Sequence, residues 1–180
     1  MRFLRIALAV CVALGLLSDR ANAADRLCDP AFENCRTPLL NLINAETVGI
    51  DVAFWFMEDT RYSTALINRW KAGVPVRVIM DSRANASYAH NIAVLDALRT
   101  AGIPMREKSS SGIVHWKMML FAGQNTVQFS GANYSPHAFR YTQPYVDYID
   151  EVIYFTDEPA IVNSFKRRYD DVWATTRGYR

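Results

Sequence analysis

The 180-residue chain is poor in the side chains from which metal sites are usually built. It contains only three histidines and three cysteines, and no Cys or His cluster accompanies Cys28 and Cys35. A structural zinc site needs about four such ligands close together. The sequence therefore predicts no metal site, and we expect no other cofactor.

The chain also lacks a strong excess of charge. Its net charge is +2, and without the first 23 residues, which carry three arginines and one aspartate, 17 basic and 17 acidic residues remain. Proteins that bind nucleic acid through its phosphates usually carry a clear basic excess. The neutral composition disfavours a nucleic-acid substrate but does not exclude one, because a local basic groove can form on a neutral protein.

No hydrophobic run is long enough to span a bilayer as an ordinary helix, since the apolar stretch IALAVCVALGLL has about 12 residues. Arg2 and Arg5 precede this stretch, and the small-x-small sequence Ala21-Asn22-Ala23 follows it. The pattern predicts a signal peptide over residues 1–23 that is cleaved after Ala23. We therefore expect a secreted or periplasmic protein.

The two cysteines beyond this leader, Cys28 and Cys35, have six residues between them. An even number of cysteines in an exported protein usually indicates a disulfide. We predict that this bond fixes the N-terminal segment, residues 24–36, to the rest of the domain. Two free thiols are the alternative.

No repeat, low-complexity run or linker divides the remaining sequence, which predicts one domain over residues 37–180. Apolar periodicity predicts helices over 37–45, 60–71 (with Thr60 as N-cap), 91–100 and 158–174. Runs rich in β-branched and aromatic residues predict strands at 47–56, 74–81, 103–108, 114–121, 126–132 and 151–157. This alternation indicates an α/β fold with a mixed β-sheet flanked by helices on both faces, in which the last strands are antiparallel.

The most informative stretch is VHWKMMLFAGQNTVQFSGANYS, residues 114–135. In a strand, His115 and Lys117 would project from one face, while Trp116 and Met118 would project from the other. Asn133 ends the next β-rich run, where a hairpin would bring it beside the pair. An imidazole, an ammonium and a carboxamide are the groups needed to attack a phosphodiester, with histidine as nucleophile or proton carrier and the others holding phosphate oxygens. The alternative is a solvated strand face that carries a polar pair.

This stretch resembles the phosphodiesterase motif of the phospholipase D superfamily, which reads His-x-Lys, four residues, Asp, six residues, Gly-Ser-x-Asn. His115 and Lys117 match, and Asn133 matches with one extra residue in the spacing. The family's aspartate is replaced by Ala122, and its Gly-Ser pair is inverted to Ser130-Gly131. The segments AGVPVRVIMDS and LRTAGIPMREK are also similar to the family, so the resemblance spans about residues 37–175.

The resemblance implies the fold of a single catalytic half and several roles. Ser130 and Gly131 are candidates for substrate binding. An acidic residue near the start of the strand after the motif loop hydrogen-bonds the catalytic histidine in family members, and Glu151 is the candidate here, with Asp147 and Asp150 as competitors.

Family enzymes bring two motif copies together across a pseudo-twofold axis, and this chain carries one. We therefore expect either a homodimer or a second catalytic half in a longer protein. His90 and His137 lack a lysine two residues on, and we expect helix-flanking and surface-loop positions for them.

Three functions agree with these observations. The first is a secreted phospholipase D-type phosphodiesterase that hydrolyses a phospholipid headgroup ester through a phosphohistidine. The second is a secreted nuclease with the same chemistry that acts as a homodimer. The third is a catalytically inactive binding domain, suggested by Ala122 and the Ser130-Gly131 inversion.

Overall fold

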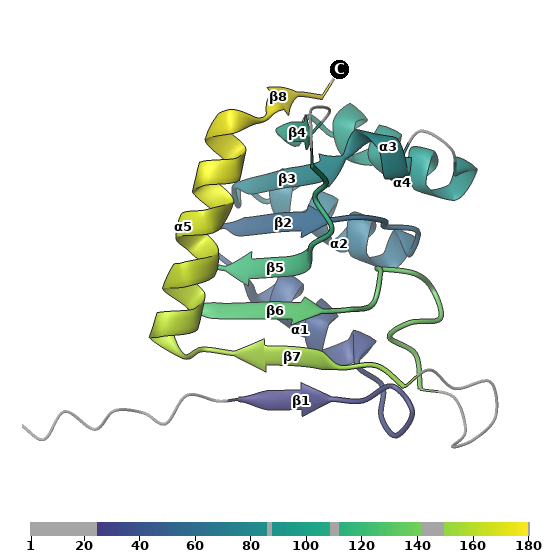
Figure 1. Cartoon of the computed structure of the whole chain (residues 1–180), viewed down its shortest axis with the longest axis vertical. Coiled ribbons are helices and arrows are strands. Elements are labelled where there is room, and N and C mark those ends of the chain that lie inside the picture. The colour runs from purple at the N-terminus through teal and green to yellow at the C-terminus, as the bar shows by residue number, and fades with distance from the viewer. Residues whose placement is uncertain (1–24, 86–87, 109–111, 142–149, 180) are drawn as a thin grey trace, which may run out of the picture.

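A computed structural model describes residues 25–85, 88–108, 112–141 and 150–179 of the chain. The described residues form one eight-stranded sheet with the strand order β1-β7-β6-β5-β2-β3-β4-β8 (Figure 1). Strands β2, β3 and β4 pair in parallel, and every other neighbouring pair is antiparallel. The strands are β1 (Arg26–Cys28), β2 (Ile50–Phe54), β3 (Val76–Asp81), β4 (Met105–Lys108), β5 (Lys117–Phe121), β6 (Thr126–Ser130), β7 (Ile153–Thr156) and β8 (Arg177–Gly178).

Helices cover both faces of the sheet, as Figure 1 shows for α5 in front and for α1 and α2 behind. The helices are α1 (Arg36–Ala45), α2 (Thr60–Lys71), α3 (Ser82–Asn85), α4 (Ala89–Thr100) and α5 (Pro159–Thr175). Helices α1, α2 and α4 share one hydrophobic cluster with the sheet, and α5 shares a second cluster on the opposite face. The predicted mixed sheet with helices on both faces is confirmed.

Strand β2 shows why the sequence folds this way, because all five of its residues are buried. Ile50, Val52 and Phe54 belong to the cluster beneath α1, α2 and α4, whereas Ala53 belongs to the cluster beneath α5. A strand that is covered on both faces needs apolar side chains at nearly every position. The near-continuous apolar run in the sequence is the signature of this position in the sheet.

The structure differs from the sequence-based expectation in a few places. The edge strands β1 and β8 have three and two residues, too short for a period-two pattern to reveal them. His115 lies just before β5, which begins at Lys117. The N-cap of α2 is Asp59 rather than Thr60, because the Asp59 carboxylate accepts a hydrogen bond from the backbone N–H of Arg61.

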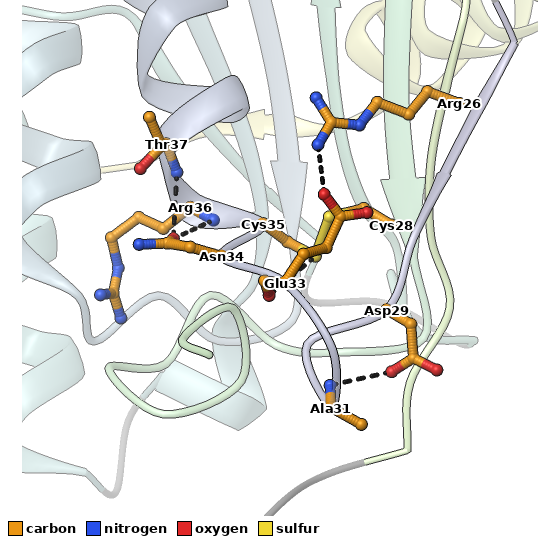
Figure 2. The surroundings of a disulfide bond; sticks show 9 residues. All are labelled: Arg26, Cys28, Asp29, Ala31, Glu33, Asn34, Cys35, Arg36 and Thr37. Atoms are coloured by element: carbon orange, nitrogen blue, oxygen red, sulfur yellow. Dashed lines mark hydrogen bonds and ion pairs between the residues drawn. A yellow bond between two sulfur atoms is a disulfide. The ribbon is translucent and has the colours of Figure 1, made fainter. Parts of the chain in front are cut away.

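A disulfide joins Cys28, the last residue of β1, to Cys35, the N-cap of α1 (Figure 2). Both cysteines are fully buried. Within the short loop between them, Asp29 accepts a hydrogen bond from the Ala31 N–H, and the Asn34 side chain accepts from the N–H groups of Arg36 and Thr37. The bond therefore ties the edge of the sheet to the start of α1.

The predicted signal peptide lies outside the described residues. Within the described ranges, none of the helices combines the length and the apolar character that a membrane crossing requires.

Candidate active site

The predicted site residues gather at one edge of the sheet. Strands β2 and β3 end there, β6 also ends there, and the antiparallel strands β5 and β7 begin there (Figure 1, right-hand side of the sheet). Lys117 is paired with Phe54, the last residue of β2, and Ser130 is paired with Ile153, the first residue of β7. The topology therefore brings the His-x-Lys pair, the end of β6 with Asn133, and Glu151 to the same edge.

His115 and Lys117 are in direct contact. The Lys117 Nζ lies 3.1 Å from both His115 Nδ1 and Nε2, and it donates to the His115 carbonyl oxygen at 3.2 Å. Lys117 is buried, with 4% of its surface exposed, whereas His115 is exposed and its ring lies 5.2 Å from the Trp55 ring. The ammonium thus supports an imidazole that faces the outside of the molecule.

The two faces around this pair are separated as the sequence predicts. Met118 belongs to the hydrophobic cluster beneath α5, and Trp116 packs against that cluster. Met119, two residues after Lys117, belongs to the opposite cluster. The alternation of β5 therefore turns Lys117 away from α5.

Burial has the largest effect on the pKa of Lys117. Desolvation lowers the pKa of Lys117, and the negative charge of Glu151 raises it in part. The net direction is downward, so part of the usual preference of this ammonium for the charged state is lost. A phosphate bound next to Lys117 would favour its charged form, because a nearby anion stabilises a desolvated ammonium.

Glu151 precedes β7, and its position depends on a glycine opposite. The Glu151 Oε1 accepts a hydrogen bond from the Val152 N–H at 2.9 Å. A Cβ built on Gly131 would lie 2.8 Å from the same oxygen, so the missing side chain leaves the room that the carboxylate fills. Among the hydrogen bonds of the described residues, none joins Glu151 to His115. The orienting role of Glu151 stays a prediction; Asp150 is exposed, and Asp147 lies outside the described residues.

Asn133 is held in place through its neighbour Tyr134. The Tyr134 N–H donates to the Phe56 carbonyl at 3.2 Å, and its carbonyl accepts from the N–H groups of Glu58 and Asp59 at 2.9 and 3.0 Å. These bonds fasten Asn133 to the segment that follows β2. The Asn133 Oδ1 is buried without a hydrogen-bond partner among the described residues.

Ser130 is partly engaged within its own turn. Its hydroxyl donates to the Ala132 carbonyl at 3.0 Å. The predicted role of Ser130 in substrate binding therefore requires either its acceptor lone pairs or a rotation of the hydroxyl. Gly131 beside it contributes space for the Glu151 carboxylate.

A buried ion pair, which the sequence did not reveal, supports the loop after Asn133. The Arg36 Nε donates to the Asp59 Oδ2 at 2.9 Å, and the side chains of Arg36 and Asp59 are 8% and 1% exposed. Arg36 also donates from its guanidinium to the Pro136 carbonyl and from its backbone to the Phe139 carbonyl. The loop is thus fixed to the starts of α1 and α2.

The far end of the β5–β6 hairpin, where Ala122 replaces the family's aspartate, is anchored by Glu46. One oxygen of this fully buried carboxylate accepts hydrogen bonds from the N–H groups of Val48 and Gly123 at 2.7 and 2.8 Å. It also accepts from two further N–H groups, those of Thr47 and Gly49, and the other oxygen accepts from the Gln124 side chain. Burial raises the pKa of Glu46, but these hydrogen bonds outweigh burial and hold it below its ordinary value.

A cavity of about 480 Å³ adjoins the site. Its walls include Phe56, Glu58, Tyr88, Asn133 and Glu151. Gly131 also lines it, so three of the predicted site residues border a space large enough for part of a substrate.

The structure also shows where the other two histidines lie and whether potential metal ligands gather. His90 lies exposed in the first turn of α4, and His137 lies exposed in the loop after Asn133. Among the described residues, no three or more His, Cys, Asp or Glu side chains come together as metal ligands would.

Known proteins with similar sequences and structures point to one family. The family model described as cardiolipin synthase, PLD-like domain, matches residues 39–173. Mitochondrial cardiolipin hydrolase of Xenopus laevis is 27% identical over 146 residues, 81% of this chain and 62% of that protein. The protein of the same name from Danio rerio is 27% identical over 136 residues, 75% of this chain and 55% of that protein. The chain thus spans a little under two thirds of the curated relatives that it matches.

Solved structures agree on the fold. Nuc from Salmonella typhimurium, described as a phospholipase D family member, superposes with a TM-score of 0.74 at 23% identity, covering 88% of this chain and 99% of that one. NucT from Helicobacter pylori superposes with a TM-score of 0.71 at 16% identity, covering 87% and 99%. The chain belongs to the phospholipase D-like family, which confirms the resemblance predicted from the motif.

Proposed function

We propose that the protein is a phosphodiesterase that hydrolyses the headgroup ester of a phospholipid. The observation that carries the proposal is the contact of the buried Lys117 ammonium with the exposed His115 imidazole, at an edge of the sheet that also holds Asn133. The similarity to proteins named cardiolipin hydrolases supports a phospholipid as the substrate class.

The chemistry follows from these groups in two steps. An imidazole nitrogen of His115 attacks phosphorus, the bond from phosphorus to the headgroup oxygen breaks, and the leaving alkoxide takes a proton from a second group. Water, giving its proton to that second group, then cleaves the phosphohistidine and releases phosphatidic acid. Lys117 and Asn133 donate hydrogen bonds to the phosphate oxygens on which charge accumulates.

The second proton-handling group is best supplied by another copy of the motif. Once its attacking nitrogen is bonded to phosphorus, His115 cannot also protonate the leaving oxygen. A homodimer would place the partner subunit's His115 across a twofold axis, which makes the contact isologous. The exposed position of His115 agrees with this arrangement. A second catalytic half in a longer protein is the other way to supply the group.

Headgroup release from phosphatidylcholine vesicles, measured without added metal, tests the proposal. His115→Ala should abolish turnover, while His137→Ala, which removes an exposed histidine from the neighbouring loop, should retain it. Residual activity of His115→Ala within tenfold of the wild type would remove His115 from the mechanism.

Dilution and subunit mixing test the dimer. Specific activity should fall as the protein is diluted below its dimer dissociation constant, and an excess of His115→Ala subunits should inhibit the wild type. A fully active monomer would instead point to another acid, such as His137.

A homodimeric nuclease is the second candidate. The fold match to Nuc, which covers 99% of that chain, favours a small unit of this kind, whereas the neutral composition disfavours it. Nicking of plasmid DNA without phospholipid turnover would establish the nuclease. A folded dimer that is silent in both assays would establish the inactive binding domain.

The proposal includes export, with residues 1–23 as the cleaved leader. Sequencing the N-terminus of the protein recovered from the producing cells tests it. A mature chain that begins at Ala24 is expected, and a retained Met1 would contradict export by this route.

A further inference from the structure

The segment that carries His115 lies outside the ladder of the sheet. Strand β5 begins only at Lys117, and residues 112–116 in front of it belong to no helix or strand. The strand order β5-β2-β3-β4 makes this segment cross the ends of β3 and β2 on its way from β4 to β5, as Figure 1 shows. A misplacement of about 1 Å in an attacking group can cost a factor of about 10² in rate. Contacts other than ladder bonds must therefore fix the backbone in front of His115.

Two charged side chains at the end of β3 supply such contacts. Asp81, the last residue of β3, accepts a hydrogen bond at Oδ2 from the Val114 N–H at 3.0 Å. The guanidinium of Arg83, in α3, donates to the Gly112 carbonyl. Both bonds reach backbone atoms within three residues of His115. They therefore fix the course of the chain directly before the imidazole.

Asp81 and Arg83 also orient each other. Arg83 Nε donates to Asp81 Oδ1 at 3.1 Å, and Arg83 Nη2 donates to Asp81 Oδ2 at 2.9 Å. A bidentate pair of this kind fixes direction as well as distance. The Asp81 side chain is fully buried, whereas that of Arg83 is 49% exposed. Burial raises the pKa of Asp81, but the hydrogen bonds from Arg83 and Val114 outweigh burial and lower it, so the carboxylate remains an acceptor.

The ring of His115 has few contacts of its own that would orient it. The His115 carbonyl accepts from Lys117 Nζ at 3.2 Å, and the imidazole lies against the Trp55 ring. Among the hydrogen bonds of the described residues, none joins a carboxylate to the imidazole. The direction in which the ring points therefore depends on where the preceding backbone places it.

We infer that Asp81 and Arg83 are positioning residues, which fix the backbone of residues 112–114 and thereby the place from which His115 attacks phosphorus. This inference rests on the proposed phosphodiesterase function. Loss of the Asp81–Arg83 pair would displace the nucleophile, while Lys117 would stay in β5. We therefore expect kcat to fall with little change in KM, because the geometry of attack is altered and the binding of substrate is not.

Arg83→Lys tests the inference with little disturbance, because it keeps a positive charge beside the buried Asp81 carboxylate. A single ammonium lacks the planar fork with which Arg83 bonds both Asp81 oxygens and the Gly112 carbonyl. For the full chain, we expect kcat on bis(4-nitrophenyl) phosphate to fall about 10–100-fold, with KM within about twofold. The matched control is Arg99→Lys, which changes a half-exposed pair with Asp96 and should alter neither value. An unchanged kcat, or a change in KM alone, would overturn the inference.

A second readout does not depend on turnover. The chain has three histidines, so substitution of His90 and of His137 assigns the imidazole signals of His115 in NMR spectra. In Arg83→Lys the His115 signals should shift or broaden and the Val114 amide should exchange faster with solvent, while the other histidine signals stay in place. Unmoved His115 signals would overturn the inference. If they move but the wild type cleaves neither bis(4-nitrophenyl) phosphate nor phosphatidylcholine, the pair positions His115 as inferred and the proposed function is refuted instead.

Discussion

Among the single substitutions of a glutamate by glutamine, Glu46→Gln is expected to destabilise the fold the most. Its carboxylate receives hydrogen bonds from four backbone N–H groups and one side-chain amide, and these bonds hold together the α1–β2 loop and the β5–β6 turn. Hydrogen bonds to a charged acceptor contribute about 1.5–3 kcal/mol net, against about 1 kcal/mol for neutral ones. Bonds that share one oxygen do not add fully.

The expected loss in the free energy of unfolding differs between Glu46→Gln and Glu46→Ala. In Glu46→Gln the charge is lost and the new amide meets the donating amide of Gln124, so we expect a loss of about 2 kcal/mol in the free energy of unfolding. In Glu46→Ala the four backbone N–H groups lose this acceptor, while the Gln124 amide keeps its bond to the Leu42 carbonyl. Thr47, Val48 and Gly123 are exposed, so water can reach part of the turn, and we expect about 3 kcal/mol rather than the full sum.

The effect should depend on pH in a defined direction. The pKa of Glu46 in the folded protein lies below its ordinary value of 4.5. Its contribution is therefore fully present above the unfolded-state pKa and is lost as the pH falls through the lower, folded-state pKa. The gap in stability between wild type and Glu46→Gln should be constant near neutral pH and should narrow below about pH 4.5.

Urea unfolding, followed by tryptophan fluorescence at several pH values, measures this gap. The matched control is Glu33→Gln, because Glu33 makes a half-exposed ion pair with Arg26 that should contribute no more than about 1 kcal/mol. A Glu46→Gln variant within about 0.5 kcal/mol of Glu33→Gln, or a gap that does not change with pH, would refute the anchoring role.

Lys117→Ala should lower kcat by about 10²–10³-fold, because it removes a charged donor to the transition state; a rise in KM alone in steady-state kinetics would make Lys117 a holder of the ground-state phosphate. Arg36→Ala should cost about 2–3 kcal/mol in urea unfolding, since it removes the buried partner of Asp59 and the bond to the Pro136 carbonyl, while Arg61 still pairs with Asp59, and a loss below about 1 kcal/mol would contradict this. The double variant Cys28→Ser/Cys35→Ser should lose about 2 kcal/mol, whereas unchanged unfolding would show that the bond constrains little.

The sequence predicted the parts of this fold that depend on local pattern. The apolar runs of β2 and β3 and the periodic helices α2 and α5 correspond to strands and helices within a few residues. The positions of Lys117 and Asn133 at one edge followed from a short hairpin, although His115 lies just before β5 rather than within it. These features depend on residues that are close together in the chain, so a single sequence reveals them.

Long-range polar contacts could not be predicted in this way. Arg36 and Asp59 are 23 residues apart, and Glu46 and Gly123 are 77 apart, so no periodicity links them. Glu46 directly follows a helix and is fully buried, although no local pattern in the sequence marks a buried carboxylate there. The cavity that adjoins the site likewise combines residues from the segments after β2 and β6 with Tyr88 and Glu151, and only the fold brings them together.

The disulfide determines whether strand β7 is exposed as an edge to which another chain could pair. Without β1, strand β7 would be an edge, with the unpaired backbone groups of its sequence Ile-Tyr-Phe-Thr open to another chain. Only three residue pairs hold β1 there, and the last of them pairs Cys28 with Ile153. An open, uncharged edge of this kind is a template for self-association. The covalent bond to α1 therefore keeps this short strand paired with β7, so the disulfide limits self-association through that edge in addition to stabilising the fold.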